Sequence, residues 1–214
     1  MKMKSLLLAA LPLVACTALR ISAQTPPVAG DPVQYTDTYH VQHPWNLPES
    51  ARFSISPGPI YNLFILKGDA GFTPTTHTGS RTEMRWDTNW TVNEHVWEAD
   101  VLIDAGSEGS AIQQVHAVCC AFEPVYVQVL PAGDLRNDNS STHFAQALWG
   151  KWFHMVVAYD PTSGNGRVWV NGSLVMTRHD PHPLSTQWYF KNGVYGISGS
   201  RSETHYKNIR FWHK

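Results

Sequence analysis

The chain has 214 residues, of which 43% are hydrophobic and only 15% are charged. Soluble proteins average roughly 25% charged residues, so this composition argues against disorder and against a long solvated helix. The formal net charge is −1, but Lys2, Lys4 and Arg20 lie in a leader without acidic residues. Taking these three from the 16 basic residues leaves 13 against 17 acidic ones, a net charge of −4. Such a chain is a poor candidate for nucleic-acid binding, which requires a strongly basic surface.

The first 23 residues have the pattern of a secretory signal peptide. Lys2 and Lys4 precede an apolar run over Ser5–Ala18, and small residues before Gln24 suit cleavage by signal peptidase. We therefore predict a secreted, extracellular protein with a signal peptide at 1–23 and a single domain at 24–214, since no linker-like stretch interrupts the chain. Cys16 lies in a segment that also resembles a bacterial lipobox. Lipidation of this cysteine is the one membrane association that the sequence leaves open, because no other segment approaches the roughly 20 apolar residues of a membrane span.

After the leader only two cysteines remain, Cys119 and Cys120, which are adjacent. They cannot form the disulfide framework of a small secreted domain, and without matching Cys or His spacing they do not form a structural zinc site. The alternatives are a vicinal disulfide and two buried thiols, and the sequence favours the thiols.

Short segments of alternating apolar and polar residues, separated by turn residues, fill the rest of the chain, a pattern typical of β-sandwiches and barrels. Asn171-Gly172 predicts a tight hairpin, because both residues tolerate the positive φ of a type I′ turn. The fold class is therefore all-β, a jelly-roll sandwich of two antiparallel sheets with a concave groove. The expected strands are Ile60–Leu66, Arg81–Trp86, His95–Ile103, Ala111–Val118, Val125–Leu130, Trp152–Tyr159, Gly166–Val170, Ser173–Thr177, Trp188–Gly196 and Thr204–Trp212.

Three of these strands carry polar residues of unusual chemistry on one face. Because side chains alternate along a strand, each strand places its functional groups together and its apolar residues, such as Met84, Val115 and Phe190, on the other side. One sheet surface could therefore collect two arginines, a glutamate, a glutamine, a histidine, a lysine and two tyrosines. They are Arg81, Glu83 and Arg85; Gln114 and His116; and Tyr189, Lys191 and Tyr195.

In combination and order these motifs resemble polysaccharide lyase family 7, the alginate lyases. That family has an Arg-(Thr/Ser)-Glu-Leu-Arg strand, a Gln-(Ile/Val)-His strand and a Tyr-Phe-Lys-Ala-Gly-x-Tyr-Asn-Gln strand. The present chain follows all three from about Phe53 to about Trp212, with Met84 in place of the leucine, Asn192 in place of the alanine and Gly196-Ile197 in place of the final Asn-Gln. The resemblance implies a jelly-roll enzyme that cleaves a 4-linked uronate polymer by β-elimination.

Elimination requires that the uronate carboxylate be neutralised before the neighbouring C5 proton can leave. The resemblance implies that Gln114 and Arg81 donate hydrogen bonds to this carboxylate as charge develops in the transition state, and that Arg85 shares the role. Glu83 is expected to hold the two guanidinium groups in place.

Proton transfer falls to two further residues. Tyr195 is expected to protonate the departing O4 and is also a candidate to remove the C5 proton, while His116 is the candidate second base. Lys191 and Tyr189 are expected to bind neighbouring sugars by charge and stacking. The Val between Gln114 and His116 hints at a preference for mannuronate-rich blocks.

No cofactor or metal is expected, because elimination needs neither and because the His40/His43 and His179/His182 pairs lie in Pro-rich loops. A hydrolase with paired carboxylates is disfavoured, since Leu102 occupies the third acidic position of the sandwich-hydrolase pattern. The expected partner is an anionic polysaccharide, with no nucleic acid or membrane, and the expected state is a monomer. Two alternatives stay open, a glucuronan lyase of the same fold and a non-catalytic carbohydrate-binding sandwich.

Overall fold

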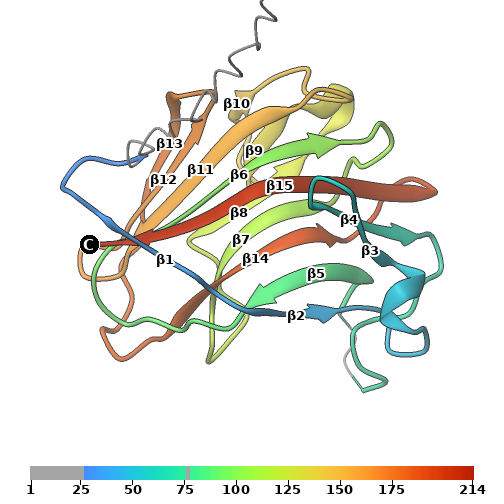
Figure 1. Ribbon diagram of the computed structural model, residues 1–214, viewed down its shortest axis with the longest axis horizontal. Helices are drawn as coiled ribbons and strands as arrows, with labels where there is room; N and C mark the ends of the chain where they lie inside the picture. Colours follow the sequence, from blue (N-terminus) through green and yellow to red (C-terminus); the bar gives the residue numbers. More distant parts are fainter. Residues whose placement is uncertain (1–26, 76–77) are drawn as a thin grey trace, which may run out of the picture.

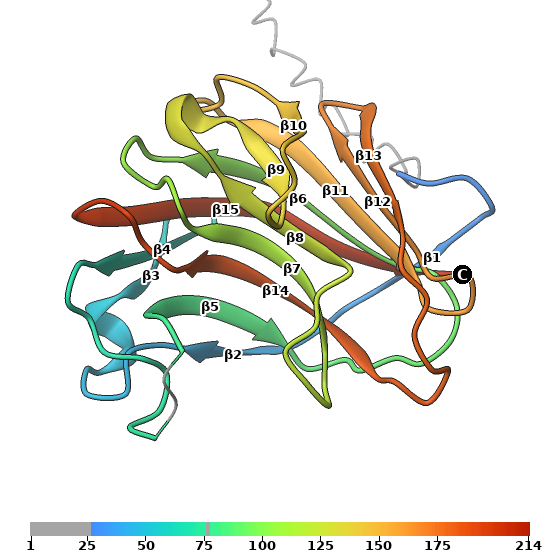
Figure 2. The ribbon, with the colours of Figure 1, turned by 180° about the vertical axis from the view of Figure 1, so that it is seen from behind.

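In a computed structural model, which describes residues 27–75 and 78–214, the protein is a sandwich of two antiparallel sheets (Figures 1 and 2). This confirms the predicted jelly-roll class. Helical structure in the described residues is limited to two short 3₁₀ turns, η1 (Glu49–Ala51) and η2 (Pro131–Gly133). None of the described helices is long and apolar enough to cross a membrane.

The first sheet has eight strands, and seven of them follow the order β13-β12-β11-β6-β15-β4-β3, with β1 pairing to β15. Their bounds are β1 (Val33–Tyr35), β3 (Phe53–Ser56), β4 (Ile60–Leu66), β6 (His95–Ile103), β11 (Phe153–Asp160), β12 (Asn165–Val170), β13 (Ser173–His179) and β15 (Arg201–His213).

The second sheet has seven strands in the order β10-β9-β8-β7-β14-β5-β2. Their bounds are β2 (Tyr39–Gln42), β5 (Arg81–Trp86), β7 (Ala111–Ala117), β8 (Val125–Val129), β9 (Leu135–Asn137), β10 (His143–Ala145) and β14 (Trp188–Tyr195). Figure 2 shows β7, β14 and β5 side by side in this sheet, so three segments far apart in the sequence are neighbours in space.

All ten predicted strands are present, within a few residues at each end. The predicted hairpin is also confirmed. Asn171 and Gly172 have φ values of 50° and 80°, and Val170 pairs directly with Ser173, as a two-residue type I′ connection requires.

The core lies between the two sheets and is rich in aromatic rings. Trp97, Trp188, Tyr159, Tyr206 and Phe190 are each less than 2% exposed. Burying a large apolar side chain stabilises the fold by about 1.5–3 kcal/mol, so these rings account for much of the driving force for packing the sheets. The predicted core-side residues of the seven-stranded sheet, Met84, Val115 and Phe190, belong to this core.

Candidate active site

The strand order brings together the three sequence motifs. In the seven-stranded sheet β14 lies between β7 and β5, with Tyr189 opposite His116, Lys191 opposite both Gln114 and Arg85, and Tyr195 opposite Arg81. Paired residues of adjacent antiparallel strands project to the same face, so the functional groups share the face turned away from the core.

Beneath this face lies a buried charge network centred on Glu83, whose side chain is 1% exposed. One carboxylate oxygen, Oε2, lies 2.6 Å from Lys191 Nζ and 3.6 Å from an Arg81 nitrogen. The other, Oε1, accepts a 2.6 Å hydrogen bond from the amide of Gln114, which is also 1% exposed. The carboxylate of Glu83 therefore holds the side chains of Gln114 and Arg81 in place.

The position of Lys191 differs from the sequence prediction. Its side chain is 1% exposed and its ammonium group is paired with Glu83, so it is not presented to a ligand above the sheet. Burial lowers the pKa of Lys191, and the adjacent Glu83 carboxylate opposes that shift. That Lys191 binds a neighbouring sugar stays a prediction, and its contact with Glu83 supports a positioning role instead.

Glu83 contacts only one of the two guanidinium groups that it is expected to hold. Arg81 contacts Glu83, but Arg85 donates hydrogen bonds to the Asn89 side chain at 2.7 Å and to the Trp86 carbonyl at 2.6 Å. Arg85 lies two residues beyond Glu83 on β5, and its carboxylate partner is Asp87, with an oxygen 3.9 Å from an Arg85 nitrogen.

Each guanidinium lies on a tyrosine ring of the neighbouring strand. Arg81 is 4.3 Å from the Tyr195 ring centroid, and Arg85 is 4.1 Å from that of Tyr189. These cation–π contacts orient both arginines over the face. Burial raises the pKa of Tyr189, and the nearby Arg85 charge partly offsets the shift.

A second tyrosine near Tyr195 was not singled out from the sequence. Tyr126 of β8 lies opposite Gln114, and its ring is 6.5 Å from the Tyr195 ring. Burial raises the pKa of Tyr126 well above the ordinary value of 10, so its hydroxyl stays protonated. The alternation Val125-Tyr126-Val127 is the signal that could have placed this ring on the functional face.

The imidazole of His116 is held on both edges and on one face. Its Nδ1 is 2.6 Å from the Ala117 carbonyl oxygen, its Nε2 is 3.0 Å from a Glu123 carboxylate oxygen, and its ring is stacked on Tyr189 at 5.1 Å. Sequence reasoning missed Glu123, because a single glutamate in a loop carries no periodic signal.

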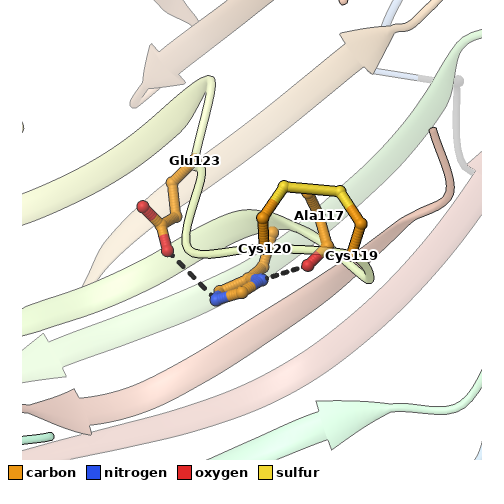
Figure 3. Close-up of a disulfide and its surroundings, with 5 residues drawn as sticks. Ala117, Cys119, Cys120 and Glu123 are labelled. Atoms are coloured by element: carbon orange, nitrogen blue, oxygen red, sulfur yellow. Dashed lines mark hydrogen bonds and ion pairs between the residues drawn. A yellow bond between two sulfur atoms is a disulfide. The ribbon is translucent and has the colours of Figure 1, made fainter. Parts of the chain in front are cut away.

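The loop that carries Glu123 also contains the two cysteines. Cys119 and Cys120 are exposed and form a vicinal disulfide, so the prediction of two buried thiols is wrong (Figure 3). Both cysteines lie beyond the end of β7, in the loop that leads to β8, and this part of the loop is exposed to solvent.

The two histidine pairs considered from the sequence make ordinary local contacts. His40 lies 3.0 Å from Asp87, and His179 lies 3.0 Å from Asn165. Among the residues that the structure describes, one group of possible metal ligands has its ligand atoms within 4.8 Å of one another, namely Asp104, Glu203 and His205. Glu203 and His205 belong to β15 of the other sheet, so this group is not part of the candidate site.

Comparisons with known structures define the class of fold. An alginate lyase of polysaccharide lyase family 7, AlgAT5, superposes with a TM-score of 0.66 at 17% identity, covering 83% of this chain and 94% of the other. The family 7 alginate lyase A1-II′ in complex with a substrate gives 0.66 at 16% identity over 83% and 93%. The enzyme AlyA1 from Zobellia galactanivorans gives 0.60 at 14% identity over 85% and 95%. The chain therefore has the jelly-roll fold of polysaccharide lyase family 7.

Sequence comparison gives a different relative. A citrate-binding protein from Hevea brasiliensis is 28% identical over 181 residues, which are 82% of this chain and 74% of that protein. No protein-family model matches the sequence. The similarity in fold and the similarity in sequence thus point to proteins that are named for different functions, although both kinds of ligand, uronates and citrate, are carboxylates.

Proposed function

We propose that the protein is a secreted polysaccharide lyase that cleaves a 4-linked uronate polymer by β-elimination. Alginate with mannuronate-rich blocks is the first candidate substrate, and glucuronan is the second. The observation that carries this proposal is the gathering of Arg81, Gln114, His116 and Tyr195 on one face of a sheet with the family 7 fold.

The proposed reaction begins with the substrate carboxylate. Arg81 and Gln114, both fixed by Glu83, donate to it and so stabilise the charge that develops when the C5 proton leaves. The C5 proton passes to the deprotonated hydroxyl oxygen of Tyr195 where it lies on the same side of the sugar ring as O4, and to His116 where it lies on the opposite side. The electron pair of the broken C5–H bond forms the C4=C5 double bond, and the C4–O4 bond breaks. O4 leaves with its electron pair and takes a proton from Tyr195, whose ring is oriented by Arg81.

Secretion is part of the proposal, although the leader at 1–23 and Cys16 lie outside the described residues. The exposed Cys119–Cys120 disulfide supports it, because disulfides persist mainly in oxidising compartments. The domain boundary at residue 24, a monomeric state and a groove above the sheet face stay predictions.

A second candidate function is the non-catalytic binding of a small carboxylate, favoured by the similarity to the citrate-binding protein. The same cationic face could bind citrate without reaction. The two functions differ in product, since only a lyase generates a conjugated unsaturated sugar.

The deciding experiment measures ultraviolet absorbance of that product with pure mannuronate and guluronate blocks, glucuronan and heparin, alongside calorimetric titration with citrate. Tyr195→Phe should reduce kcat by about 10²–10⁴-fold while polymer binding persists. Tyr126→Phe is the matched control, because its hydroxyl stays protonated and should not exchange protons with substrate. Absence of product from every polyuronate, together with citrate binding, would replace the lyase proposal by the binding one.

A further inference from the structure

Both nitrogens of the His116 ring face hydrogen-bond acceptors. The Ala117 carbonyl oxygen is 2.6 Å from Nδ1, and the Glu123 carboxylate is 3.0 Å from Nε2; Figure 3 labels both acceptors and marks their contacts with dashed lines. Neither acceptor carries a proton to donate, so a ring that makes both contacts donates from both nitrogens. In this arrangement His116 has no free lone pair with which to accept a proton.

The loop between β7 and β8 fixes Glu123 in this position. The Phe122 N–H donates to the Cys120 carbonyl at 2.9 Å, and the disulfide ties Cys120 to Cys119 at the turn. The Phe122 ring packs against that of His182 with centroids 3.6 Å apart, which anchors the residue next to Glu123. Figure 3 shows the disulfide and Glu123 on the same loop. The backbone of Glu123 is therefore held in place by the loop, which keeps its carboxylate near His116.

The remaining surroundings of His116 reinforce this geometry. Its ring is stacked on that of Tyr189 with an interplanar angle of 24°, and the guanidinium of Arg85 lies 4.1 Å from the centroid of the same Tyr189 ring. Glu123 is the charged partner at hydrogen-bond distance from the imidazole. Side-chain exposures of 18% for His116 and 23% for Glu123 leave the pair at the surface of the site, where a sugar could contact it.

The stereochemistry of the substrate makes this pairing consequential. In mannuronate and glucuronate the C5 proton and O4 lie on the same side of the ring, so one residue can remove the first and protonate the second. In guluronate they lie on opposite sides, so a second group across the ring from Tyr195 must accept the C5 proton. On this sheet face His116 is the candidate for that group.

We infer that Glu123 is a specificity-determining residue that occupies the Nε2 of His116 and so withholds the second base that guluronate requires. With His116 engaged, Tyr195 is left to act as both base and acid, which restricts cleavage to mannuronate or glucuronate linkages. Glu123 is thus a positioning residue that acts through His116. This inference rests on the proposed lyase function and deepens it by naming the residue that selects the uronate epimer.

The test compares kcat/KM on pure guluronate and pure mannuronate blocks for the wild-type protein and for Glu123→Ala. Freeing Nε2 should raise the ratio of guluronate to mannuronate cleavage by about 100-fold, the lower end of the contribution of a general base. Asp138→Asn is the matched control. It removes an exposed carboxylate close enough to affect Tyr126 without touching His116, and it should leave the ratio unchanged. An unchanged ratio in a folded Glu123→Ala protein would overturn the inference.

A second measurement does not depend on activity. Nitrogen-15 NMR of the His116 ring should show protons on both nitrogens in the wild-type protein and loss of the Nε2 proton in Glu123→Ala at neutral pH. If Glu123→Ala does not fold, Glu123→Gln keeps the volume, removes the charge and should give a smaller change of the same sign. If the wild-type protein cleaves no polyuronate while the ring responds to Glu123→Ala, the lyase function fails and the pairing stands. If it cleaves mannuronate while neither ring nor ratio responds, the inference alone fails.

Discussion

The role of Lys191 can be tested by removing its charge while keeping its volume. In the structure its ammonium group and the Glu83 carboxylate are 2.6 Å apart and both side chains are 1% exposed. Breaking a buried ion pair by removing one partner costs about 3–5 kcal/mol, because an uncompensated charge is left behind. Gln114 and Arg81 also contact Glu83 and would partly compensate its charge. We therefore expect Lys191→Met to lower the free energy of unfolding by about 3 kcal/mol, the lower end of that range.

Urea denaturation provides the measurement. With a dependence of about 3 kcal/mol per molar urea, the midpoint should fall by about 1 M in Lys191→Met. In Glu83→Gln/Lys191→Met both charges are gone, so the double variant should lose less stability than the sum of the single variants, by about 1 kcal/mol or more. If Lys191→Met instead keeps the wild-type midpoint and only raises KM, Lys191 contacts substrate and the buried-pair argument is wrong.

Three further results are expected. Gly193→Ala should destabilise the protein by about 2–6 kcal/mol in the same assay, because φ is +149° and a Cβ would lie 2.2 Å from the Thr82 carbonyl oxygen of β5; a change under about 0.5 kcal/mol would contradict this. Burial, with a smaller contribution from His213, lowers the pKa of His95 to about 4, against about 6.5 when unfolded. Between these values only the unfolded chain binds the proton, so stability should fall as pH drops from 6.5 to 4, and His95→Gln should flatten that decline; equal slopes would refute it. Finally, KM for a polyuronate should rise with ionic strength as the Debye length shortens to about 8 Å at physiological salt; a flat KM would indicate an uncharged glycan.

The longer strands could be predicted from sequence because each shows enough alternating positions for a pattern to emerge. The predicted bounds of Arg81–Trp86 and His95–Ile103 agree with β5 and β6. The strands that were missed, β1, β2, β3, β9 and β10, have only three or four residues. A segment of that length contains at most two residues on its buried face, which cannot be distinguished from a loop.

The sequence predicts which side chains share the sheet face. It does not predict how deeply each side chain is buried or which residue it contacts. A period of two places Lys191 on the same face as Tyr189 and Tyr195, which the pairing to β5 and β7 confirms. Whether a lysine on that face extends to solvent or folds down onto Glu83 depends on neighbouring strands, so its burial could not be predicted. Glu123 reaches His116 only through the course of one loop, and no periodicity encodes a loop.

The distribution of charge on the face favours an extended polyanion over a compact one. Lys191 is buried against Glu83, and Glu123 lies against His116. Arg81 and Arg85 have looser ion pairs, at 3.6 Å from Glu83 and 3.9 Å from Asp87, so of the cations on this face they are the ones more open to a ligand. Arg81 and Arg85 are four residues apart on β5, a separation of about 13 Å at roughly 3.3 Å per residue. Each lies on its own tyrosine ring, which holds the two guanidiniums apart. The three carboxylates of one citrate stand on a short carbon chain and cannot bind both sites fully at once, whereas a uronate polymer carries one carboxylate on every sugar. The geometry of the two arginines therefore supports a polymer that runs along β5 and β14, beside Gln114 and Tyr195.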